Sequence, residues 1–173
     1  RSFGLNITLP YEQTSNHVVA HSDKLINFYY FFVRKLNFVA ESDAMVAFPG
    51  GFGTMDEVFE TLTLIQTGKA TIYPIVLLDS PGKPFWLNWL AFIRVELVDS
   101  GLISADDLHL IHVTKNPAEA MEHIDRFYRI FHSYRFVGDS IVIRLNAQLP
   151  AQWVEHLERD FSDLILPGGK MIQ

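Results

Sequence analysis

The sequence contains no cysteine, which excludes disulfide bonds, thiol catalysis and zinc sites built on cysteine. Only 20% of the residues are charged, and their balance is acidic, with a formal net charge of −6. A broad basic face for a nucleic-acid backbone is therefore not expected. The longest apolar run, from Phe28 to Val33, is far shorter than the ~20 residues of a membrane-spanning helix. No basic segment followed by an apolar stretch opens the chain, so we expect a cytoplasmic protein without a membrane partner.

What the sequence does contain is typical of a folded domain. The chain has 173 residues, of which 49% are apolar. This length is enough for one domain with a sizeable buried core. The composition is too apolar for a disordered chain and too mixed for a membrane protein.

The apolar pattern predicts strands and helices that alternate along the chain. We expect strands over residues 3–9, 44–48, 73–78 and 108–114, and helices over residues 23–40, 54–67, 85–100 and 117–132. This order predicts an α/β fold, with a Rossmann-like, doubly wound parallel sheet and helices on both faces. A strand over 140–145 and a helix over 151–164 predict a C-terminal α/β appendage. We expect residues 1–132 to form the main domain and residues 133–173 to form an extension that packs on it.

The first predicted element is already a strand. Doubly wound folds begin with a βα unit that carries a glycine-rich turn, and no such turn precedes residue 3. The pattern therefore predicts that this chain is the C-terminal part of a longer protein.

The segment from Phe48 to Glu57 (FPGGFGTMDE) lies between a predicted strand and a predicted helix. Gly50, Gly51 and Gly53 are expected to let the backbone approach a ligand closely and adopt positive φ. The amides and the dipole of the following helix suit a phosphate, and the carboxyl end of a strand is where open α/β sheets bind ligands. The segment matches neither a Walker A loop nor the dinucleotide fingerprint. It predicts a phosphate-binding loop of another type.

A purely structural interpretation of the same segment is a helix start. Thr54 and Glu57 have the spacing of a capping box, in which the threonine caps the helix and the glutamate reaches back to it.

Two adjacent cations, Arg34 and Lys35, stand in an otherwise apolar stretch. Burying an arginine there is costly unless it meets an anion, and arginine clamps phosphate or carboxylate well. An ion pair within the protein, or a helix end that reaches water, is the alternative. Glu12 follows the first predicted strand and could line the same cleft, or belong to a polar loop.

Histidines occur in two pairs, but a third ligand is evident for neither, so no metal site is expected. The pairs are His17 with His21 and His109 with His112.

The Arg34-Lys35 pair and the segment Pro49 to Glu57 together resemble the LOG (Lonely Guy) family, whose members were formerly labelled lysine decarboxylases. The family pattern is an Arg-Lys pair followed by Pro-Gly-Gly-x-Gly-Thr-x-x-Glu, and both elements occur here in that order. The stretch from Leu64 to Lys69 continues in the style of the longer bacterial members.

The resemblance implies a Rossmann-like, nucleotide-binding hydrolase that forms a homodimer or a higher homo-oligomer. Its implied activity is that of a phosphoribohydrolase, which cleaves the N-glycosidic bond of a nucleoside 5′-monophosphate, either AMP or a cytokinin-type nucleotide. By the same resemblance Arg34 and Glu57 are the catalytic pair, and no metal or cofactor is needed. The residues implied to contact the substrate are Lys35, Gly50, Gly51, Phe52, Gly53, Thr54 and Thr63, with Glu12 as the candidate for the family's upstream glutamate.

These residue types suit that chemistry. Cleavage builds positive charge on the sugar, which a carboxylate such as Glu57 can stabilise while it orients water. Lysine decarboxylation is disfavoured, because it needs a Schiff-base lysine in a cofactor site. A non-catalytic nucleotide-binding or sensor protein is the alternative function, and a purely structural subunit is a third.

Overall fold

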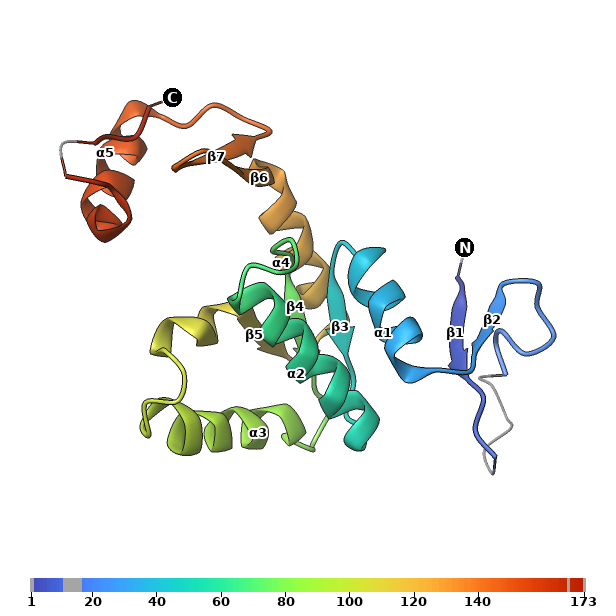
Figure 1. The fold of residues 1–173 in the computed structure, drawn as a ribbon. Coiled ribbons are helices and arrows are strands. Elements are labelled where there is room, and N and C mark those ends of the chain that lie inside the picture. Colours follow the sequence, from blue (N-terminus) through green and yellow to red (C-terminus); the bar gives the residue numbers. More distant parts are fainter. Residues whose placement is uncertain (1, 11–16, 168, 173) are drawn as a thin grey trace. The chain divides into compact units, whose positions relative to one another are not determined.

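The computed structural model describes residues 2–10, 17–167 and 169–172 (Figure 1). The chain divides into two compact units, Arg1–Ile124 and Asp125–Gln173. Helix α4 (Pro117–Ile130) runs from the first unit into the second.

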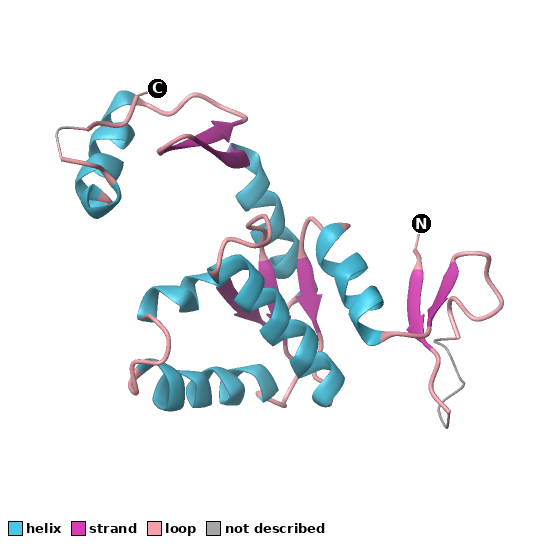
Figure 2. Cartoon of the chain, viewed as in Figure 1, coloured by secondary structure: helices cyan, strands magenta, loops and turns pink. Residues whose placement is uncertain are grey.

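The strands of the first unit pair in parallel, and helices alternate with most of them (Figure 2). One sheet consists of β1 (Gly4–Ile7) and β2 (Leu25–Phe28). The other has β4 (Ile75–Leu78) between β3 (Met45–Ala47) and β5 (Ile111–Thr114). The predicted α/β class with parallel strands is confirmed.

The core of the first unit is centred on β4, in which every residue is buried. A central strand of a parallel sheet is covered on both faces, which explains its continuous apolar run. Helix α2 (Phe52–Gln66) adds Val58 and Ile65 to this core, and α3 (Phe85–Ile93) adds Trp86.

Helix α3 is capped from a distance by the residue that follows β4. Asp79 is buried, and its Oδ1 accepts a hydrogen bond of 2.8 Å from the backbone N–H of Trp86. Its other oxygen lies 3.4 Å from the backbone nitrogen of Leu87. This carboxylate therefore satisfies first-turn amides that would otherwise be unpaired. A π-helical segment (Arg94–Val98) extends α3, and the chain turns at Gly101, whose φ is +70°.

The predicted helix over residues 23–40 is wrong in its first half. Leu25–Phe28 pairs with β1 as a strand, and only Phe31–Ala40 forms a helix, α1, in which no residue is buried. An apolar run this short has no periodicity that distinguishes a buried helix from a parallel strand. Pairing with β1 makes this run a strand.

The strand predicted over residues 108–114 also begins later. Ser104 forms a capping box with Asp107, which starts a 3₁₀ helix at Ala105–Leu110 and delays β5 to Ile111.

The second unit contains an antiparallel hairpin followed by a helix. Strands β6 (Phe131–Val137) and β7 (Ser140–Leu145) are joined by a turn in which Gly138 has a φ of +58°. Helix α5 (Ala151–Asp160) and a 3₁₀ turn (Ser162–Leu164) follow. Strand β6 was not predicted, and the helix predicted over 151–164 stops at residue 160.

Within the described part of the chain, no helix has both the length and the apolar character to cross a membrane.

Replacing Asp79 by alanine should lower the free energy of unfolding by about 1–2 kcal/mol, because the amides at the start of α3 lose their acceptor. Asp79→Asn, which keeps a carbonyl oxygen in place, should lose less. Urea denaturation of both variants measures this, and an alanine variant as stable as the unchanged protein would contradict the assignment of the cap.

Candidate functional site

The glycine-rich loop connects the end of β3 to the start of α2. Gly51 is the N-cap residue, and its carbonyl accepts hydrogen bonds from the amides of Thr54 (3.1 Å) and Met55 (3.2 Å). No side chain of the described residues caps this helix. The capping-box interpretation is therefore wrong: Thr54 lies within the first turn, and amides of that turn remain available to an anion.

The three glycines of the loop have different roles. A Cβ atom at Gly50 would lie 2.9 Å from the Cβ of Thr54, so packing excludes a side chain there. At Gly51 and Gly53, apart from the chain neighbours and the backbone of the helix itself, no described atom lies within 4 Å of such a Cβ. The prediction of positive φ is wrong for this loop, since the described glycines with positive φ are all elsewhere: Gly68, Gly82, Gly101 and Gly138. Neither packing nor backbone geometry thus demands glycine at 51 and 53, and their small size leaves open space in front of the helix.

Arg34 on α1 and Glu57 on α2 form an ion pair beside this loop. The Nη2 atom of Arg34 donates to Oε1 of Glu57 over 2.8 Å, and the two side chains are only 15% and 17% exposed. The guanidinium carbon lies 5.5 Å and 5.8 Å from the ring centroids of Phe31 and Phe38, which suits cation–π contact. Its Nε is buried and has no hydrogen-bond partner among the described residues. Arg34 therefore retains a donor for a further acceptor.

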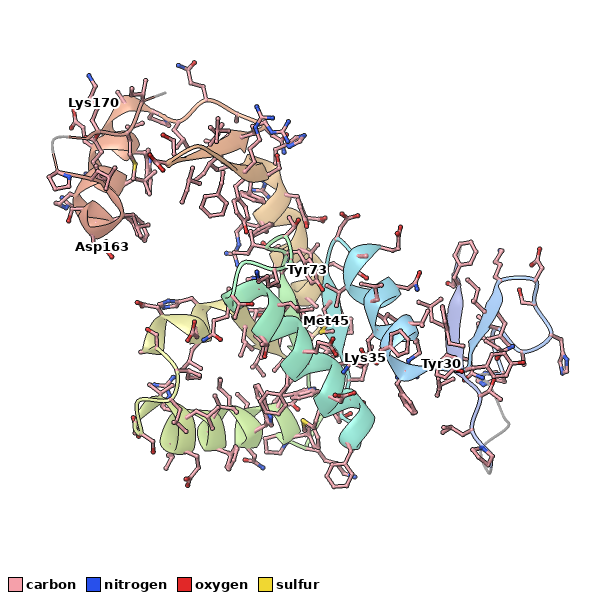
Figure 3. The ribbon with its side chains drawn as sticks, in the orientation of Figure 1. Tyr30, Lys35, Met45, Tyr73, Asp163 and Lys170 are labelled. Carbon is pink, nitrogen blue, oxygen red and sulfur yellow. The ribbon has the colours of Figure 1, made fainter. Side chains whose placement is uncertain are left out.

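Lys35 makes a second set of ion pairs between the same two helices. Its Nζ lies 3.0 Å from Oδ1 of Asp56 and also contacts Glu60. Figure 3 shows Lys35 between the two helices. Arg34 and Lys35 therefore form ion pairs within the protein, which was the alternative interpretation of these two cations. The ion pairs place both cations next to the start of α2.

A cavity of about 450 Å³ adjoins Glu57. Its walls include Phe38 of α1, strand β3, and Thr54 and Glu57 of α2. Met45 and Tyr73, both labelled in Figure 3, also line it. Burial raises the pKa of the Tyr73 phenol above its ordinary value of 10.0, so this side chain is neutral at neutral pH. The cavity is largely apolar, with the Glu57 carboxylate at its edge.

The structure thus brings most of the predicted site residues together. Phe52 is almost fully exposed at the start of α2. Thr63 lies six positions beyond Glu57 on the same helix; its hydroxyl donates to the Phe59 carbonyl, and it lines a separate cavity with Trp89. Its expected substrate contact stays a prediction. Glu12 lies outside the described residues.

Sequence reasoning missed three residues of this region. Asp56 and Glu60 are four positions apart, so they lie on one face of α2 beside Lys35. That spacing is visible in the sequence and could have indicated them. Tyr73 carries no such signal, because only the fold places it against the cavity.

Fold and site together define an α/β protein with an uncapped, glycine-rich helix N-terminus and a paired arginine and glutamate beside it. A family model described as possible lysine decarboxylase matches residues 1–124. The chain belongs to this family, and the resemblance to LOG proteins is confirmed.

Three plant proteins are among the curated relatives that resemble this chain. The probable cytokinin riboside 5′-monophosphate phosphoribohydrolase LOGL2 of Oryza sativa subsp. japonica is 32% identical over 94 residues, which cover 54% of this chain and 37% of that protein. Two cytokinin riboside 5′-monophosphate phosphoribohydrolases of Arabidopsis thaliana also match. LOG5 is 27% identical over 64% of this chain and 44% of its own length, and LOG2 is 32% identical over 54% and 42%. The chain thus spans less than half the length of these relatives.

Gly53→Ala should stabilise the protein by about 0.5–1 kcal/mol, because alanine is the better helix former and its methyl group meets open space. The same methyl group should weaken binding of inorganic phosphate, because it obstructs the approach to the first-turn amides. Gly50→Ala is the contrasting variant, and its clash with Thr54 should lower stability by about 1–3 kcal/mol. Thermal denaturation and calorimetric phosphate titration separate the two effects. Unchanged phosphate affinity in Gly53→Ala would contradict the role given to the loop.

Proposed function

We propose that this site hydrolyses the N-glycosidic bond of nucleoside 5′-monophosphates and releases a free base and ribose 5-phosphate. The observation that carries the proposal is the Arg34–Glu57 ion pair, 2.8 Å long and largely buried, beside the uncapped N-terminus of α2. A site that only held phosphate would gain little from a carboxylate next to its anion. Hydrolysis of the glycosidic bond of a nucleotide would use both, an anion site for the 5′-phosphate and a carboxylate at the sugar.

In this proposal the loop holds the 5′-phosphate. The first-turn amides of α2 and the positive end of its dipole face the anion, and Gly51 and Gly53 leave room for its oxygens. Lys35, which pairs with Asp56 of α2, and the unpartnered Nε of Arg34 would add charge-assisted hydrogen bonds to the phosphate.

Glu57 acts at the sugar. As the bond to the base lengthens, positive charge grows on C1′ and the ring oxygen, and the carboxylate stabilises it. Glu57 also takes a proton from water, whose oxygen forms the new bond to C1′. The electron pair of the broken bond leaves with the base, which takes up a proton from solvent, and Glu57 returns its proton to solvent, so that one water is consumed in all. Arg34 fixes the carboxylate in place through its 2.8 Å hydrogen bond.

The cavity beside Glu57 suits the base. Its volume of about 450 Å³ is within the usual range for small-molecule sites, and its walls are largely apolar. The exposed Phe52 ring at the start of α2 is available to stack on a purine. AMP and cytokinin-type nucleotides are the substrates that we propose, the latter because the curated relatives are named for them.

Assembly into a homo-oligomer and a cytoplasmic location also belong to this proposal. Helix α1 supports the first, because Phe32 and Leu36 remain exposed on it and exposed apolar groups favour contact with a further surface.

A non-catalytic nucleotide-binding or sensor role is the second candidate. Such a protein would use the same phosphate site, and the ion pairs of Arg34 and Lys35 would serve only to join α1 to α2.

Glu57→Gln should abolish release of adenine from AMP while leaving AMP binding within a few-fold, because glutamine keeps an acceptor for Arg34 but cannot take a proton. Chromatography for adenine and ribose 5-phosphate, with calorimetry for binding, measures both. Glu41→Gln, at the exposed end of α1, is the matched control and should retain full activity.

Two results would contradict the proposal. Equal adenine release by Glu57→Gln and the unchanged protein would exclude the carboxylate from the chemistry. Binding of AMP and cytokinin-type nucleotides without release of any base would favour the sensor role.

A further inference from the structure

Lys35 is held by two carboxylates that differ in their surroundings. Its own side chain is 16% exposed, whereas those of Asp56 and Glu60 are 53% and 36% exposed. Asp56 follows the first turn of α2, and Glu60 lies one turn further from the glycine loop. The Lys35 ammonium group contacts both.

The charges in this cluster do not favour an anion. Two cations, Arg34 and Lys35, face three carboxylates, those of Asp56, Glu57 and Glu60. A phosphate at the start of α2 must therefore replace a carboxylate as a partner of Lys35 or be repelled by it. Asp56 is the more exposed and the nearer to the loop, so it loses less by turning into water.

We propose that Glu60 is a positioning residue, which keeps the Lys35 ammonium directed at the loop, and that Asp56 is the partner which substrate phosphate displaces. This inference rests on the proposed function and assigns Glu60 and Asp56 opposite roles at the same site. Glu60 stays bound to Lys35 while phosphate takes the place of Asp56.

The two roles predict effects of opposite sign. If the carboxylates acted only by repulsion, removing either negative charge would strengthen anion binding. Because Glu60 holds Lys35 in place, Glu60→Gln should instead weaken binding. Asp56→Asn, which removes a competitor, should leave binding unchanged or strengthen it.

The experiment compares Asp56→Asn and Glu60→Gln in the full chain, with ribose 5-phosphate as the calorimetric probe, since it has no glycosidic bond to lose. We expect roughly fivefold weaker binding for Glu60→Gln and equal or up to roughly fivefold tighter binding for Asp56→Asn. Effects of the same sign and size in both variants would overturn the proposal.

A second measurement follows the chemical reactivity of the Lys35 amine directly and does not depend on enzymatic activity. The rate at which a dilute amine-acylating reagent modifies Lys35 is followed by mass spectrometry, with the exposed Lys69 as the internal control. Glu60→Gln should raise the rate at Lys35 several-fold, whereas Asp56→Asn should change it little. If the unchanged protein fails to bind ribose 5-phosphate, the proposed phosphate site is wrong. In that case the acylation rates test only the positioning role of Glu60. Equal rates at Lys35 in the two variants would overturn that role.

Discussion

The ion pair between Arg34 and Glu57 is the interaction on which the candidate site depends. Helix α1 has no buried residue, so apolar packing alone does not fix how it faces α2. The 2.8 Å hydrogen bond and the ion pairs of Lys35 join the two helices. The rings of Phe31 and Phe38 flank the guanidinium group. Because both charged side chains are largely shielded from water, solvent screens the pair less than one on an open surface. The same contact holds the Glu57 carboxylate in the second turn of α2, near the open N-terminus of that helix.

The backbone of the loop and the side chains of the ion pairs contribute different groups to the candidate site. The backbone supplies uncapped amides at the start of α2, and Gly50 allows the close approach of Thr54 that shapes the turn. The side chains supply charge that the backbone lacks, with Lys35 held beside the loop by its two carboxylates. The core behind the site, centred on β4 and Trp86, keeps α2 in place. Rigid support of this kind is what a site needs to hold substrate and carboxylate in a fixed relation.

The sequence predicted the class of fold, because strand–helix alternation is a local signal, whereas the pairing of Arg34 with Glu57 was implied by the resemblance to the LOG family. The predictions were wrong where contacts between residues distant in the sequence determine the local structure. Leu25–Phe28 became a strand because β1 lies beside it, and no local period distinguishes that from a buried helix. Thr54 has the spacing of a cap, yet the helix starts two residues earlier and Glu57 turns to Arg34 instead. Tyr73 reaches the cavity only through the packing of α2 on the sheet, which no motif records.

The most direct test of the central claim is an NMR titration of the full chain with ribose 5-phosphate, which the proposed reaction does not consume, following the backbone amides of Gly51 to Gly53 and the side-chain Nε–H of Arg34. The account predicts that these signals shift together with one saturable affinity, because phosphate meets the amides while Arg34 gains the acceptor that its Nε lacks among the described residues. Saturable shifts confined to other parts of the chain, with the loop and Arg34 unmoved, would contradict it.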